Sequence, residues 1–345
     1  MRKLFSGTVG ILLMLMLAFT LFASAPAHAV QEVDWGTASV GSSGHAALTS
    51  LTTVLNREME DYNFNVLPTA GAVQSMIQYG MNDVDAFYGA DVGFLEYAED
   101  RRRLEGFADQ TERDLVQTFW GYTLEVGLAI RADDVDKYEE WRDLEGETVF
   151  TGPAPWDVRA AMLHPMEVLD VGHDYTEIDL DMVGSSLGAG HVEAINAYTS
   201  GERTVPSWLM EAEMETDIAV LNPSEEEVEM LEDEGIEVVS VDSDVFETDP
   251  MVDEVIRVPF FYGFHTGPEV MSEEDVVEML EVIKENTEEL EESDATFGQI
   301  NEDFIDIQVR GIRSTHEDIK VHPGLAAFLQ DHGAWEEEWD DRIME

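Results

Sequence analysis

The chain has 345 residues, of which 75 are acidic and 18 basic, and its formal net charge is −57. It contains no cysteine, which excludes a disulfide framework and a lipid-modified N-terminal cysteine. Hydrophobic residues make up 44% of the chain, which excludes a disordered acidic tail and is enough to build two cores.

The chain starts with a segment typical of a secretory signal peptide. Arg2 and Lys3 precede an apolar run over residues 11–23, and residues 27–29 supply a small-x-small cleavage pattern. The apolar run is shorter than a bilayer span, and a retained anchor is the alternative. We expect a signal peptide over residues 1–29 and a mature protein that is released, without lipid, into a periplasm.

Three strand–loop–helix units are expected next, with strands at 37–40, 64–67 and 84–88. Parallel strands place such loops at one edge of a sheet, where helix N-termini offer N–H groups and the positive end of the helix dipole. The loops hold small residues, which also suit plain tight turns. We predict a cradle for a carboxylate or phosphate formed by Ser42, Ser43, Gly44, His45, Thr69, Ala70, Gly71, Ala72 and Gly89.

Several short motifs follow one another in a specific order over nearly all of the mature chain. They lie at residues 41–44, 66–74, 82–86, 91–92, 143–146, 192–197, 216–221, 263–267 and 322–324. Their order resembles that of the TAXI family of solute receptors, the extracytoplasmic binding proteins of one class of TRAP transporters. The resemblance implies an α/β, two-lobe periplasmic binding protein (type II-like) with a ligand cleft between the lobes. It also implies membrane subunits of a TRAP transporter as partners.

The first lobe is expected over residues 30–132, the second over 133–250, and the return to the first lobe over 251–345. A strand at 148–151 ends in a loop before a helix, so this loop faces the ligand from the other side. Here the sequence departs from the family, because two prolines remove backbone donors and Trp156 adds an apolar face. The expected ligand residues on this side are Pro153, Trp156, Asp157, Tyr198 and Arg203. A surface arginine paired with Glu202 or Glu211 is the alternative for Arg203.

Three other features of the sequence have structural interpretations. The basic run 101–103 is expected to end a helix and to pair locally with Glu96, Glu99 and Asp100. His265 and His322 have no histidine at zinc-like spacing, and we expect both to pack or to form hydrogen bonds. Ser272 and Asp275 predict a capping box.

Two alternative functions remain at this point. Residues 184–188 match the G-x-S-x-G pattern, which would make Ser186 the nucleophile of a secreted hydrolase. The acidic composition would also suit a cation-binding protein, but the best EF-hand-like fragment, 179–184, lacks a third carboxylate and the closing Glu. We interpret the charge instead as adaptation to brine, because at about 1 M salt the Debye length is roughly 3 Å and carboxylate repulsion is screened.

The sequence therefore predicts a monomeric binding protein rather than an enzyme. It would capture a small organic anion, a dicarboxylate or an acidic amino acid, by closing its lobes. No cofactor, metal or nucleic acid is expected to bind.

Overall fold

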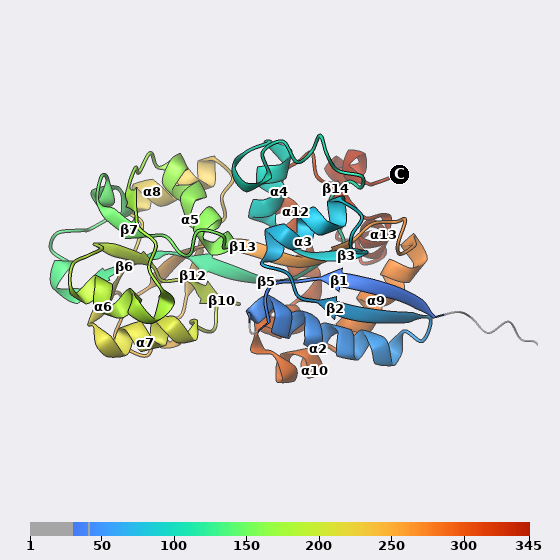
Figure 1. Cartoon of the computed structure of the whole chain (residues 1–345), viewed down its shortest axis with the longest axis horizontal. Helices are drawn as coiled ribbons and strands as arrows, with labels where there is room; N and C mark the ends of the chain where they lie inside the picture. Colours follow the sequence, from blue (N-terminus) through green and yellow to red (C-terminus); the bar gives the residue numbers. More distant parts are fainter. Residues whose placement is uncertain (1–29, 41) are drawn as a thin grey trace, which may run out of the picture.

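The computed structural model describes residues 30–40 and 42–345, and the predicted signal peptide lies outside them. Two α/β lobes lie side by side, each built on its own sheet (Figure 1). The predicted fold class, a two-lobe α/β protein, is confirmed. Within the described residues, no helix is long and apolar enough to span a membrane.

The sheet of the first lobe has the strand order β10-β5-β13-β3-β1-β2, and β12 also pairs with β13. Strand β1 is parallel to β2 and β3, whereas β13 is antiparallel to β3 and β5. The strands are β1 (Gln31–Gly36), β2 (Tyr62–Leu67), β3 (Ala86–Ala90), β5 (Phe119–Val126), β10 (Thr199–Ser200), β12 (Val239–Val241) and β13 (Val255–Thr266). A separate small sheet pairs β4 (Val116–Gln117) with β14 (Lys320–Val321).

Strand β1 lies earlier in the chain than predicted. It spans Gln31–Gly36, and the expected strand at 37–40 was wrong. Val33 and Trp35 are fully buried and alternate with polar neighbours. Trp35 pairs with residues of both β2 and β3, so burial and pairing on two sides hold the strand at this place.

Helices cover both faces of the first sheet. Figure 1 shows α3 and α4 above the strands and α2 and α10 below them. The predicted capping box at Ser272 and Asp275 is confirmed at the start of α9. The helices are α2 (Ser43–Glu58), α3 (Ala72–Gly80), α4 (Asp91–Ala98), α9 (Glu273–Glu285), α10 (Thr287–Ser293), α11 (Gly298–Glu302), α12 (Phe304–Ser314) and α13 (Pro323–Asp331).

The second lobe is smaller and has the strand order β11-β6-β9-β7-β8. Its strands are β6 (Leu128–Arg131), β7 (Thr148–Phe150), β8 (Asp174–Tyr175), β9 (Ala194–Asn196) and β11 (Ile218–Leu221). Its helices are α5 (Asp157–Val168), α6 (Val183–Gly188), α7 (Ser207–Glu215) and α8 (Glu225–Asp233). The proposed lobe boundaries at residues 133 and 250 stay a prediction.

The chain crosses between the two sheets at three places: from β5 to β6, from β9 to β10, and from β11 through α8 to β12. Only Gly127 separates β5 from β6. A Cβ atom on Gly127 would lie 2.5 Å from Cδ of the buried Arg257 side chain, so a larger residue at this crossing would displace that side chain. Most buried apolar side chains of both lobes belong to one continuous core.

Both histidines singled out in the sequence are structural, as predicted. His265 is fully buried, its Nδ1 accepts the N–H of Thr118 at 3.0 Å, and burial lowers its pKa to about 3. His322 caps α13, because its Nδ1 accepts the N–H of Gly324 at 3.0 Å. Burial also lowers the pKa of His322, to about 4.

Candidate functional site

The helix starts of both lobes face the junction between them. Strands β1, β2 and β3 run in parallel with their carboxyl ends toward the second lobe, so α2, α3 and α4 begin there (Figure 1). In the second lobe β7 is parallel to β9, and β9 leads directly into β10 of the first sheet. The loop after β7 and the start of α5 therefore face the first lobe.

The predicted loop at the start of α2 lies at this junction. Ser42 caps the helix, since its Oγ accepts the N–H of His45 at 3.3 Å, whereas the side chain of Ser43 is exposed. Gly44 is buried against Tyr88, and a Cβ atom on Gly44 would lie 2.5 Å from the ring. Of the two predicted serine hydroxyls, the Ser43 hydroxyl is thus the one left for a ligand.

The predicted loop at the start of α3 is stabilised by Thr69 itself. Its Oγ1 accepts the N–H of Gly71 at 3.2 Å and lies within hydrogen-bond distance of the carbonyl oxygens of Thr37 and Gly71. Ala70 is exposed and Ala72 is buried. Helix α3 has no side-chain cap, so backbone N–H groups are the donors that this loop can offer.

Three tyrosines lie behind these loops and line the junction. The rings of Tyr88 and Tyr262 stack with centroids 4.7 Å apart, and the hydroxyls of Tyr88 and Tyr122 lie 2.6 Å apart. Burial raises the pKa values of all three phenols, so they stay protonated at neutral pH. The three side chains form a buried aromatic cluster that contains polar hydroxyl groups.

An ion pair across the junction joins the two lobes. Asp157, the first residue of α5, is 5% exposed, and its Oδ1 accepts a hydrogen bond from Nη1 of Arg103 at 2.6 Å. Its Oδ2 accepts the hydroxyl of Tyr262 at 3.0 Å. Nε of Arg103 also donates to the buried carboxylate of Glu96 at 2.7 Å. We call Glu96, Arg103, Asp157 and Tyr262 the junction cluster.

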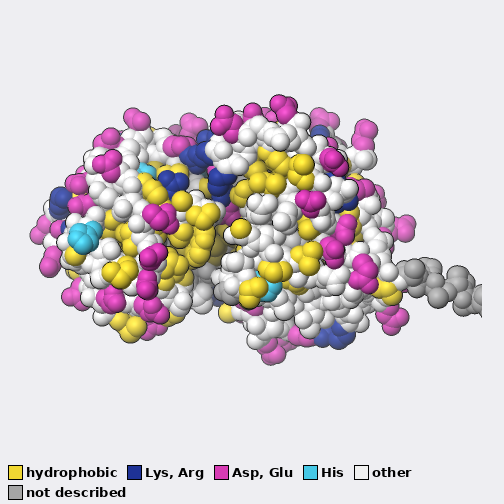
Figure 2. All heavy atoms as spheres, viewed as in Figure 1, with side chains coloured by type: hydrophobic (Ala, Val, Ile, Leu, Met, Phe, Trp, Pro, Cys, Tyr) yellow, Lys and Arg dark blue, Asp and Glu magenta, His cyan; other side chains and the backbone are white. Residues whose placement is uncertain are grey.

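Sequence reasoning missed the main role of the arginine run 101–103. Two of the three predicted local pairs exist, Arg101 with Glu99 at 2.7 Å and Arg103 with Glu96 at 2.7 Å, whereas Asp100 accepts the N–H of Gly106 instead. The same run also reaches the second lobe, where Arg101 and Arg102 pair with Glu167 and Arg103 pairs with Asp157. Figure 2 shows the largest group of basic side chains on this face at the upper side of the junction.

The other predicted ligand residues of the second lobe differ in how far they are exposed to solvent. Trp156 is 39% exposed beside the start of α5, Pro153 is half-buried in the same loop, and Tyr198 is buried next to the Trp208 ring. Helix α5, like α3, has no side-chain cap. This loop therefore also has backbone N–H groups to offer.

Two predicted residues do not join this group. Gly89 lies within β3, buried and paired with Gly263. Arg203 forms ion pairs with Glu291, at 2.6 Å, and with Glu302 at the surface of the first lobe. Arg203 is thus a surface arginine paired with carboxylates, but its partners are not the expected Glu202 or Glu211.

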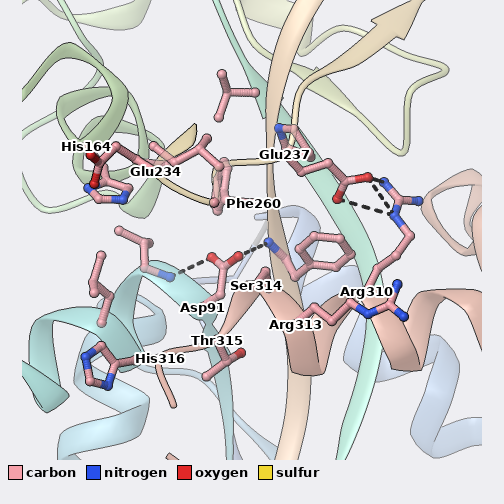
Figure 3. A pocket seen from close by; sticks show the side chains of 18 of the residues that line it. Asp91, His164, Glu234, Glu237, Phe260, Arg310, Arg313, Ser314, Thr315 and His316 are labelled. Atoms are coloured by element: carbon pink, nitrogen blue, oxygen red, sulfur yellow. Dashed lines mark hydrogen bonds and ion pairs between the residues drawn. The ribbon is translucent and has the colours of Figure 1, made fainter. Parts of the chain in front are cut away.

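A second feature of the junction is a cleft of about 970 Å³ on the side of α4 and α12. Both lobes line it: Asp91, Phe260, Phe261 and α12 from the first lobe, and His164, Glu232 and residues 234–237 from the second. Figure 3 shows Asp91 at its centre, with His164 and His316 on one side and the Arg310–Glu237 pair on the other. We call it the hinge-side cleft, because Val126 and Val258 also line it.

Two charged groups of the hinge-side cleft, Asp91 and Arg310, have partners within the protein. Asp91 accepts the N–H groups of Val92 at 2.6 Å and Phe261 at 3.0 Å, and burial raises its pKa to about 7. Arg310 pairs with Glu237 of the second lobe at 3.0 Å. In the described part of the chain, no three His, Asp or Glu side chains are arranged to hold a metal ion. The Arg310–Glu237 pair thus links the two lobes across the cleft.

The alternative nucleophile does not have the required local structure. Ser186 lies inside α6, which follows the 3₁₀ turn Leu180–Met182. A nucleophile elbow needs a sharp turn from a strand into a helix, with the serine at the turn. This geometry argues against Ser186 as a nucleophile.

Comparison with known proteins gives distant structural likeness. No family model matches the chain, and no curated protein matches it. The periplasmic aliphatic sulphonate binding protein SsuA from Escherichia coli aligns at 11% identity and a TM-score of 0.44, over 91% of this chain and 97% of that one. A putative L-cystine ABC transporter protein from Listeria monocytogenes aligns at 12% identity and a TM-score of 0.42, over 76% and 95% of the chains.

A third structure, the probable amino-acid ABC transporter extracellular-binding protein ytmK from Bacillus subtilis, aligns at 11% identity. Its TM-score is 0.42, and the alignment covers 76% of this chain and 96% of that one. The ligands in the names of these proteins are theirs and are not transferred to this chain.

Proposed function

We propose that this protein is a solute-binding receptor that captures a small organic anion between its two lobes and delivers it to a membrane transporter. The observation that carries the proposal is the junction itself. Helices that begin at the junction without a side-chain cap come from both lobes, α3 from the first and α5 from the second, and Asp157 at the start of α5 belongs to the buried junction cluster. Helices α7 and α10 also lack side-chain caps, so the position of α3 and α5 at the junction, and not the missing cap alone, distinguishes them.

A carboxylate suits this junction chemically. Helix N-termini provide backbone N–H groups and a positive dipole end, and each charge-assisted hydrogen bond is worth about 1.5 to 3 kcal/mol. The exposed hydroxyl of Ser43 adds a donor from the first lobe, and the exposed ring of Trp156 adds an apolar face from the second. Three or four such bonds would give micromolar affinity if lobe closure costs little.

The net charge of −57 opposes the binding of an anion at long range. At about 1 M salt the Debye length is roughly 3 Å, so this repulsion acts over only a few ångströms. The local donors then decide the affinity. We therefore place the receptor in a salt-adapted organism, where external brine fills the periplasm.

The finer assignment follows from the order of the sequence motifs. We propose a receptor of the TAXI type that serves a TRAP transporter and is exported as a monomer through the signal peptide at residues 1–29. The ligand would be a dicarboxylate or an acidic amino acid. Mass spectrometry of exported protein tests the leader, and an intact leader would contradict this part of the proposal.

Titration calorimetry in molar sodium chloride tests the function. Succinate and L-glutamate are titrated into the protein, with succinamide as the uncharged analogue. We expect heat from at least one carboxylate and a higher melting temperature in its presence, because a ligand that binds only the folded state stabilises it. Binding of neutral or cationic solutes alone would refute the proposed function.

A matched pair of variants tests the site. Ser43→Ala removes an exposed hydroxyl at the junction and should weaken binding several-fold. Thr53→Ala removes an exposed hydroxyl on α2 that bonds only the carbonyl of Thr49 at 2.8 Å, and binding should not change. Equal affinity of both variants would remove Ser43 from the site.

A further inference from the structure

We infer that Arg103 and Tyr262 form the carboxylate-recognition site of this protein, and that Asp157 of the second lobe occupies this site until the solute carboxylate displaces it. The inference rests on the proposed function and names the residues that recognise the ligand. Arg103 and Asp157 lie 54 positions apart in the chain, on different lobes.

The geometry around Asp157 is that of a bound carboxylate. One oxygen accepts Nη1 of Arg103 at 2.6 Å and the other accepts the hydroxyl of Tyr262 at 3.0 Å. Both donors come from the first lobe, whereas Asp157 is carried by α5 of the second. The contact exists only while the lobes are closed, so a carboxylate of the second lobe is held as a small anionic solute would be held.

Charge balance favours a solute carboxylate that replaces Asp157 over one that binds beside it. Arg103 already neutralises part of the charge of both Glu96 and Asp157, and both of these carboxylates are buried. Burial raises the pKa of Glu96, which shows that negative charge is already costly here. A third carboxylate beside one guanidinium would lack a counter-charge. The solute therefore replaces Asp157, and the net charge of the site does not change.

The surroundings supply donors for the incoming group. Nη2 of Arg103 is buried and has no hydrogen-bond partner among the described residues. Asp157 is the first residue of α5, whose first-turn N–H groups receive no side-chain cap and lie beside the place that its carboxylate occupies. A solute carboxylate can bond to Arg103, to Tyr262 and to this helix start together.

Asp157 therefore lowers the apparent affinity of the receptor, because the form that it occupies cannot bind solute. It also holds the lobes together without ligand, along with the Glu167 and Glu237 pairs. Removing its charge should open the free protein and tighten binding. Removing the charge of Arg103 should weaken binding.

The test compares Asp157→Asn, Arg103→Gln and Arg203→Gln by calorimetry with succinate and L-glutamate in molar sodium chloride. Arg203 is the matched control, because it also forms two carboxylate pairs but lies away from the junction. We expect Asp157→Asn to bind about tenfold more tightly. We expect Arg103→Gln to lose at least about tenfold and Arg203→Gln to stay within about twofold of the wild type. Circular dichroism melts check that each variant folds. If Arg103→Gln does not fold, Arg103→Lys takes its place, because lysine keeps the positive charge but lacks the forked donors of the guanidinium.

The outcomes separate the two proposals. If the wild type binds neither acid, the proposed function fails. If the wild type binds but Asp157→Asn binds equally or more weakly, Asp157 is not a competitor and the inference is overturned. X-ray scattering gives a second measurement: ligand-free Asp157→Asn should have a larger radius of gyration than the wild type, and an unchanged value also counts against the inference.

Discussion

The buried carboxyl of Asp91 should make the stability of this protein depend on pH in a way that one substitution can isolate. Burial raises its pKa from 3.8 to about 7, although the N–H groups of Phe261 and Val92 partly oppose this shift. The pKa in the folded state is thus higher than in the unfolded state. The stability that the protonated carboxyl of Asp91 contributes is fully present below about pH 4, and it is lost as the pH rises through about 7.

The magnitude follows from the size of the shift. About three pKa units, at about 1.4 kcal/mol per unit, correspond to roughly 4 kcal/mol of unfolding free energy between pH 4 and pH 8. In Asp91→Asn this titration is absent, but one backbone N–H loses its acceptor, which costs about 1 to 3 kcal/mol at every pH. The variant should therefore be less stable than the wild type near pH 4.5 and should gain about 3 to 4 kcal/mol relative to it by pH 8.5.

Urea denaturation in molar sodium chloride, at several pH values in this range, measures the difference. The other carboxylates titrate in both proteins, including Glu125, whose pKa burial raises to about 7, so their contribution cancels in the comparison. Asp109→Asn, at an exposed position, is the matched control and should show no pH-dependent difference. If the difference between wild type and Asp91→Asn does not change with pH, Asp91 does not titrate with a raised pKa and the reasoning fails.

Three further predictions concern packing, capping and charge. Gly44→Ala should cost about 1 to 3 kcal/mol, because its Cβ would lie 2.5 Å from the Tyr88 ring, whereas Gly71→Ala, with no atom within 4 Å, should be nearly neutral in thermal melts. His322→Ala removes the acceptor for the N–H of Gly324 and should lower the unfolding free energy by about 1 to 2 kcal/mol in urea, and an unchanged midpoint would refute the capping role. The net charge of −57 predicts a melting temperature that still rises with sodium chloride beyond the range where ordinary surface pairs are screened, and a flat curve would contradict this.

The parts of the fold that local chemistry determines could be predicted from the sequence. The capping box at Ser272 and the apolar period of α9 depend on residues within one or two turns of each other. Strand β1 could not be placed in this way. Its position depends on pairing with β2 and β3, which residues distant in sequence provide, whereas the expected strand at 37–40 rested on local residues alone.

The candidate site was less accessible to sequence reasoning. The loops before α2, α3 and α5 could be predicted, because small residues between a strand and a helix mark such turns. The junction cluster could not, since Arg103 and Asp157 are distant in sequence and each has nearer residues of opposite charge. The scarcity of basic residues was the one signal available, and it pointed equally to Arg203, which pairs at the surface.

Strand β13 has a thermodynamic consequence for the whole molecule. Its twelve residues pair with β12 at one end and with β3 and β5 along the rest, and a continuous apolar core extends through both lobes. Val255 at the start of β13 packs in one cluster with Val220 of the second lobe, so melting of that lobe would uncover one end of the strand. Calorimetry should accordingly record a single cooperative unit, with equal van't Hoff and calorimetric enthalpies, although the protein has two lobes.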